Sequence, residues 1–114
     1  MEAVRKSVSR KRKSMSVYMI IEAKVKDSQK YDQYISQVPE IVSKNGGRYL
    51  VRSNDVIASW GGWNPERIIL LEFPSEDHVR RWLSSPEYKA IAPLREAGAE
   101  TRVVLLEGHA SNRF

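Results

Sequence analysis

The sequence contains no cysteine among its 114 residues, which excludes disulfides, catalytic thiols and thiolate metal sites. Its two histidines, His78 and His109, are isolated and form no H-x-H or H-E-x-x-H pattern, so we expect no metal site. There is no G-x-S-x-G motif for a nucleophilic serine, and Gly46-Gly47 leads into a strand rather than opening a phosphate-binding helix. No apolar run approaches the length of a membrane span, so we expect no membrane partner.

Acidic residues are scarce at the start of the chain, where residues 1–14 carry six lysines and arginines against Glu2. Residues 15–114 carry thirteen basic and thirteen acidic side chains, so the whole net charge of +5 lies in this arm. We interpret 1–14 as a disordered basic arm, or as the result of a misassigned start with Met15 as the native initiator. A nucleic-acid grip is the alternative, and it predicts salt-dependent binding that is lost with the arm.

The neutral remainder of the chain has no basic face, so we do not expect a nucleic-acid partner. The absence of cysteine and of a secretory signal favours a cytoplasmic protein. The length is that of one domain, which we place at 15–109, with 110–114 as a tail.

Apolar periodicity predicts four strands, at Val17–Val25, Arg48–Arg52, Arg67–Phe73 and Thr101–Gly108. The segment 53–66 between the middle two is a long turn or arm. A helix is predicted from Asp27 or Ser28 to Asn45-Gly46-Gly47, with a kink or a break at Pro39. A second helix is predicted from Ser75 to Gly98, restarting at Ser85-Pro86. The order β-α-β-β-α-β predicts an α+β, ferredoxin-like fold with an antiparallel four-stranded sheet and helices on one face.

Both faces of this sheet are apolar. In Arg67–Phe73, Ile69 and Leu71 point to one face, and Ile68 and Leu70 point to the other. Two helices can cover only one face, so we predict a homodimer that packs through the open sheet faces.

Seven short segments strengthen this interpretation because they occur in order between Val17 and Gly108. They are YMIIEAKVKDSQKYDQY, GGRYLVR, W-N-P-E-R (Trp63–Arg67), LEFPS (Leu71–Ser75), W-x-x-SPEY (Trp82–Tyr88), Arg95 and a final LLEG. Together they resemble the domain of unknown function 1330 family. The resemblance implies a dimeric α/β-barrel fold, shared with small isomerases, monooxygenases and stress-related proteins, and it brings no established reaction.

Three glutamates lie on the predicted strands beside apolar neighbours, namely Glu22, Glu72 and Glu107. We place all three on the face opposite the helices, where a partner subunit would bury them. A buried carboxylate must be paired, or its pKa must rise toward the range useful for general acid–base catalysis. We therefore select Glu72 and Glu22, together with Arg67, as candidate catalytic residues.

The candidate substrate-binding residues are Arg48, Arg95, Tyr18 and Trp63. The two arginines could hold an anionic or carbonyl oxygen of a substrate, and Tyr18 begins the same sheet face as Glu22. Trp63, with Trp60, could roof a pocket or anchor a partner subunit, and we favour the second role.

We expect a homodimer whose cleft, between the sheet and its partner, binds a small organic molecule. A cofactor-free isomerase or monooxygenase that uses a Glu/Arg pair is the leading hypothesis. The alternative is a non-enzymatic ligand-binding or interaction module, in which these charges form structural ion pairs at the interface. The sequence leaves open whether the protein is an enzyme.

Overall fold

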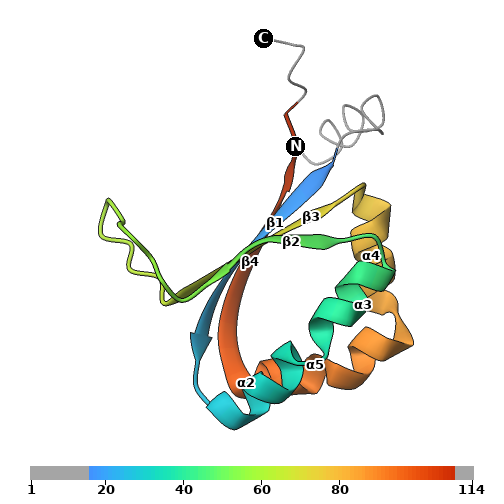
Figure 1. The fold of residues 1–114 in the computed structure, drawn as a ribbon, viewed down its shortest axis with the longest axis horizontal. Coiled ribbons are helices and arrows are strands. Elements are labelled where there is room, and N and C mark those ends of the chain that lie inside the picture. Colours follow the sequence, from blue (N-terminus) through green and yellow to red (C-terminus); the bar gives the residue numbers. More distant parts are fainter. Residues whose placement is uncertain (1–15, 110–114) are drawn as a thin grey trace.

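A computed structural model describes residues 16–109 as one sheet with helices packed on it (Figure 1). The elements, in chain order, are β1 (Val17–Val25), α2 (Ser28–Ile35), α3 (Val38–Lys44), β2 (Arg48–Ser53), β3 (Arg67–Phe73), α4 (Glu76–Ser84), α5 (Pro86–Gly98) and β4 (Ala99–Glu107). The predicted basic arm, the proposed start at Met15 and the predicted tail lie outside the described residues. Within the described part of the chain, no helix is long and apolar enough to span a membrane.

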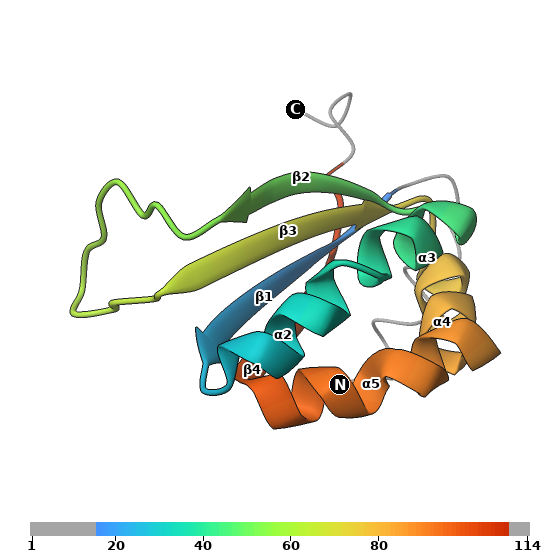
Figure 2. The same cartoon turned by 60° about the horizontal axis from the view of Figure 1, so that its bottom comes forward.

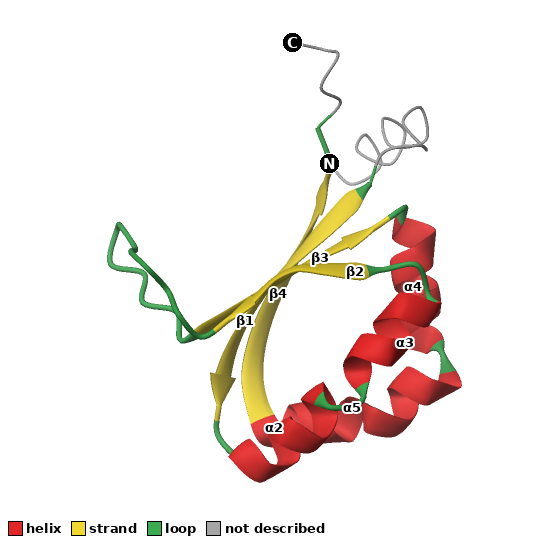
Figure 3. Cartoon of the chain, in the orientation of Figure 1, coloured by secondary structure: helices red, strands yellow, loops and turns green. Residues whose placement is uncertain are grey.

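The four strands form one antiparallel sheet in the order β2-β3-β1-β4. All four helices lie on the same face of this sheet (Figure 3). The predicted ferredoxin-like α+β fold is therefore confirmed.

Three of the four helices begin after a residue whose side chain caps them, whereas α3 has no side-chain cap. The Asp27 carboxylate accepts from the Lys30 N–H, and the Ser75 and Ser85 hydroxyls accept from the N–H groups of His78 and Tyr88. These bonds satisfy backbone donors that the first helical turn leaves unpaired. The kink or break predicted at Pro39 is a break just before it, at residues 36–37, and Pro39 lies in the first turn of α3. Pro86 opens α5 after the predicted restart.

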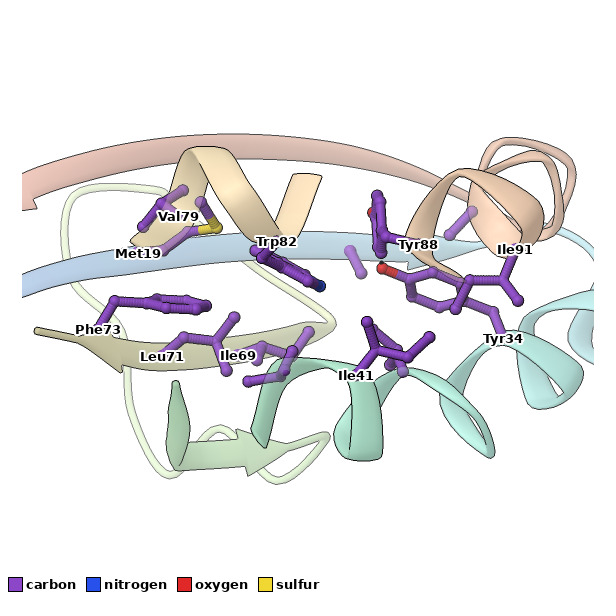
Figure 4. Close-up of a cluster of buried hydrophobic side chains, with 14 of the residues drawn as sticks. Met19, Tyr34, Ile41, Ile69, Leu71, Phe73, Val79, Trp82, Tyr88 and Ile91 are labelled. Atoms are coloured by element: carbon purple, nitrogen blue, oxygen red, sulfur yellow. Dashed lines mark hydrogen bonds between the residues drawn. The ribbon is translucent and has the colours of Figure 1, made fainter. Parts of the chain in front are cut away.

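Aromatic rings from the helices and from β3 form much of the core between the two layers (Figure 4). Phe73 stacks on Trp82 with ring centroids 5.3 Å apart, Trp82 meets Tyr88 at 4.9 Å, and Tyr88 meets Tyr34 at 6.2 Å. The hydroxyls of Tyr34 and Tyr88 share a hydrogen bond of 2.9 Å. A continuous row of rings thus lies along the helix side of the sheet.

The opposite face, here called the open face, has no covering element among residues 16–109 (Figure 3). Its apolar side chains are partly or largely exposed, and they come from three neighbouring strands: Ile20, Ile68, Leu70, Val104 and Leu106. The predicted place of Glu107 on this face is wrong. The register pairs Glu107 with Val17 and Val103 with Ile21, so Glu107 lies on the helix side of the sheet, together with Val103.

The long connection between β2 and β3 extends beyond the sheet as the predicted arm (Figure 2). Gly61 and Gly62 turn it with φ angles of 77° and 79°, a region that favours glycine. Ile57 is 95% exposed and Trp60 is 83% exposed. The predicted role of this arm at an interface stays a prediction.

Candidate functional site

The open face brings three of the predicted residues together. Arg48 and Tyr18 both lie opposite Glu72 in the register. The Arg48 Nε donates to Glu72 Oε1 over 2.6 Å, and the Tyr18 hydroxyl donates to Glu72 Oε2 over 2.9 Å. These donors lower the pKa of Glu72, Arg48 most strongly, whereas the hydrogen bond to Glu72 raises the pKa of Tyr18. Glu72 is therefore held as an anion.

Glu22 lies on the same face and pairs with Arg102, a residue that the sequence did not single out. Arg102 Nη2 and Nε donate to Glu22 Oε1 over 2.7 and 3.1 Å. Arg102 lowers the pKa of Glu22 against the opposing effect of burial, and the side chain of Trp63 lowers it further. Among the predicted site residues, Trp63 thus lies near Glu22.

These two clusters have the geometry of ion pairs on a sheet surface. A carboxylate whose pKa is lowered is a weak proton acceptor near neutral pH. The general acid–base roles of Glu22 and Glu72 stay predictions.

Arg67, the third candidate catalytic residue, points to the helix side of the sheet and does not meet either glutamate. It alternates on β3 with Ile68 and lies on the same face as Ile69. Its Nε donates to the Tyr31 hydroxyl over 3.0 Å, and its Nη1 donates to Asn54 Oδ1 over 2.9 Å. The sheet therefore separates Arg67 from the glutamates.

A β-bulge on β2 divides the arginines of that strand in the same way. The register steps from Tyr49 opposite Leu71 to Val51 opposite Leu70, so Leu50 is the extra residue. Arg48 consequently reaches Glu72 on the open face, and Arg52 lies on the helix side with its guanidinium carbon 5.0 Å from the Tyr49 ring centre. Regular alternation would have put both arginines on one face.

A cavity of about 240 Å³ lies between the helices and the sheet. Five aromatic residues contribute to its lining: Tyr31, Tyr34, Tyr49, Trp82 and Tyr88. Three arginines contribute as well: Arg52, Arg67 and Arg95. The remaining lining is apolar apart from Thr101. The cavity lies on the other side of the sheet from the cleft predicted beneath a partner subunit.

Several polar groups of the cavity are donors rather than bases. Burial raises the pKa of Tyr34 and raises that of Tyr49 to about 12, so both phenols stay protonated near neutral pH. The buried Trp82 Nε1 and Arg95 Nε have no hydrogen-bond partner among the described protein groups. The site can therefore bind and polarise an acceptor, and its lining offers no carboxylate or imidazole to remove a proton.

The cavity was missed at the sequence level because its walls come from elements far apart in the chain. Arg67 was selected as a catalytic residue and Arg95 as a substrate-binding residue of a cleft on the open face, and Tyr34 and Tyr88 carried no signal beyond their helical spacing. Within residues 16–109, no group of three or more histidines and carboxylates is arranged to hold a metal ion.

A family model described as "Domain of unknown function (DUF1330)" matches residues 16–109. No functionally curated protein matches the chain. A protein of unknown function from Rhodopseudomonas palustris shares the fold with a TM-score of 0.71 and 12% identity, over 93% of this chain and 94% of that one.

Two further solved structures have the same architecture. SnoaB, a cofactor-independent oxygenase from Streptomyces nogalater, aligns with a TM-score of 0.63 and 11% identity over 84% of this chain and 95% of that chain. A dimeric ferredoxin-like protein of unknown function from Thermobifida fusca aligns with a TM-score of 0.61 and 15% identity, over 83% and 92%. At these identities the likeness shows a common fold.

Proposed function

The chain belongs to the DUF1330 family, and from that premise we propose that it binds a small organic molecule in the cavity between its helices and its sheet. The observation that supports this proposal is the cavity itself. Protein interiors are packed to near-crystalline density, and a cavity of about 240 Å³ in a domain of this size is costly unless it is used. Largely apolar walls with a few convergent polar groups are typical of a ligand site.

We also propose that the protein is a homodimer that packs through the open face. The exposed apolar side chains of β4 and the half-buried ones of β1 and β3 support this assembly, because an apolar sheet face of this kind is normally covered. The dimeric Thermobifida fusca protein of the same fold is consistent with it. In such a dimer the Glu72–Arg48 and Glu22–Arg102 pairs lie at the interface, which is the structural role considered above. A cytoplasmic location stays a prediction.

Cofactor-free catalysis is the second candidate function. Guanidinium groups in a low-dielectric cavity stabilise an enolate or phenolate oxygen, and SnoaB is a cofactor-independent oxygenase of this fold. Because the lining lacks a carboxylate or imidazole, the cavity itself supports binding more directly than proton removal. Mass spectrometry of each bound probe after incubation in air separates a binder, which returns the probe unchanged, from an enzyme.

The binding proposal is tested with a neutral planar probe, 2-naphthamide, titrated into the full chain by isothermal titration calorimetry. We expect saturable binding, together with a shift of the Trp82 indole N–H signal in a ¹H–¹⁵N spectrum, because Trp82 lines the cavity. The exposed Trp60 is an internal control for that spectrum.

The location is tested by filling the cavity. Ile35→Trp places a larger side chain at a lining position at the end of α2, and we expect a loss of affinity of about tenfold or more. Gln33→Trp is the matched control, since Gln33 is an exposed residue of the same helix. The proposal fails if the wild-type chain binds no planar probe, or if the control loses as much affinity as Ile35→Trp in variants shown to be folded by circular dichroism.

A further inference from the structure

The cavity concentrates positive charge that no carboxylate of its lining balances. Its lining contains Arg52, Arg67 and Arg95, and neither aspartate nor glutamate. Basic and acidic side chains are equally numerous in residues 15–114, so three cations around one small cavity do not follow from the composition. Arginine stays protonated in proteins. The cavity therefore has a fixed positive potential.

Arg67 is the most deeply placed of these cations, with 9% of its surface exposed. Its hydrogen-bond partners, the Tyr31 hydroxyl and the Asn54 side-chain carbonyl, are neutral. No ion pair within residues 16–109 includes Arg67 or Arg52. Burial of a cation without a counter-charge costs free energy, and an anion in the cavity would recover part of it. The neutral partners meanwhile fix the direction of the guanidinium.

Two buried hydrogen-bond donors of the lining, on Trp82 and Arg95, indicate where the polar group of a ligand could bind. Trp82 is 3% exposed, and its Nε1–H has no acceptor among the described protein groups. In Figure 4 the indole nitrogen lies at the end of the ring turned away from Phe73. The Arg95 Nε–H is likewise buried without an acceptor, and the ion pair of Arg95 is a 3.8 Å contact with the largely exposed Glu96. Buried donors are normally paired, so both call for an acceptor.

The chemistry of the ligand follows from these features together. A carboxylate has only acceptors and matches the fork of an arginine. Rings of four tyrosines and Trp82 around about 240 Å³ leave room for one or two fused planar rings. Resting on the function proposed above, we propose that the cavity selects a small planar aromatic carboxylate, whose ring lies among the tyrosines and whose carboxylate accepts from Arg95 and Trp82.

The experiment compares two probes of nearly the same shape and different charge, 2-naphthoate and 2-naphthamide, by calorimetric titration of the full chain at pH 7. We expect the carboxylate to bind at least about tenfold more tightly, since hydrogen bonds to charged groups are markedly stronger than neutral ones. Arg95→Met should weaken the binding of 2-naphthoate more than that of 2-naphthamide, and so remove most of this preference. Arg81→Met is the control, because it removes the same charge at an exposed residue of α4 outside the lining.

The outcomes are separable. Binding of 2-naphthamide without a preference for 2-naphthoate would overturn the inferred selectivity and leave the proposed ligand site standing. No binding of either probe would overturn both. An equal loss for both probes in Arg95→Met, or an equal loss of preference in Arg81→Met, would show that Arg95 does not contact the carboxylate. Loss of the preference in Arg95→Met alone, with a shift of the Trp82 indole signal on addition of 2-naphthoate, supports the proposal.

Discussion

Replacement of Gly98 by alanine is the sharpest test of how the cavity walls are held together. A Cβ atom at this position would lie 2.7 Å from the Tyr31 backbone nitrogen and 2.8 Å from its Cα. These are backbone atoms of α2, so no rotamer change can relieve the contact. The Gly98 carbonyl also accepts hydrogen bonds from the N–H groups of Lys26 and Asp27, at 2.8 and 3.1 Å. The end of α5 and the start of α2 are therefore fixed to each other at this point.

The change in the free energy of unfolding caused by Gly98→Ala is set by two opposing effects. Overpacking by one methyl group costs about 1–3 kcal/mol, and alanine recovers up to about 1 kcal/mol over glycine through helix propensity. We expect Gly98→Ala to lower the free energy of unfolding by about 1–2 kcal/mol, and to lower the melting temperature by roughly 5–15 °C for a domain of this size. Because α2 carries Tyr31 and Tyr34, the same change should also disturb the cavity.

The assay is urea unfolding followed by far-UV circular dichroism, at one fixed protein concentration because assembly would shift the midpoint. Ala97→Ser is the neighbouring control, an exposed position where we expect a change within about 0.5 kcal/mol. A Gly98→Ala protein as stable as the wild type, or more stable, would refute the close approach of α5 to Tyr31.

Two further results are expected from the open face. The ion pairs lower the pKa values of Glu22 and Glu72, so these carboxylates stabilise the fold above the ordinary carboxyl pKa. This contribution is lost as the pH falls through the lowered pKa values. Glu72→Gln should therefore flatten the acid side of the stability–pH curve. An unchanged acid limb, or the same flattening in the exposed control Glu100→Gln, would contradict this reasoning. Leu70→Asp should convert a dimer to a monomer in light scattering after size exclusion, because it buries an unpaired charge at the proposed interface. Ser84→Asp, on the exposed side of α4, should leave the dimer intact, and a dimeric Leu70→Asp protein would rule out the open face as the interface.

The parts of the fold that could be predicted are those with a local physical cause. Val17–Val25 and Arg67–Phe73 were predicted to the residue, because continuous apolar strands are bounded by polar and turn residues. The break before Pro39 and the restart at Pro86 follow from the missing N–H of proline. Family membership was predicted from short segments in order and is confirmed.

The grouping of the candidate site residues depends on strand register and helix packing, which no local sequence pattern reveals. The bulge at Leu50 has no glycine or proline to mark it, and it turns Arg52 away from Arg48. The pairing of Glu22 with Arg102 requires the register between β1 and β4, which non-local packing sets. The cavity requires the positions of α2 and α5 over the sheet. The roles of the selected residues therefore stay predictions, and their grouping could not be read from the sequence.

The alternation along β3 has a consequence for how such a protein can change. Its odd-numbered residues lie on the helix side, where Arg67, Ile69 and Leu71 line the cavity, and its even-numbered ones, including Leu70 and Glu72, face the other way. One strand seven residues long thus contributes to two surfaces that do not touch. Under the ligand binding and the assembly proposed above, substitutions of one parity would change ligand choice and those of the other parity would change assembly. The two properties could then vary independently within a single short stretch of sequence.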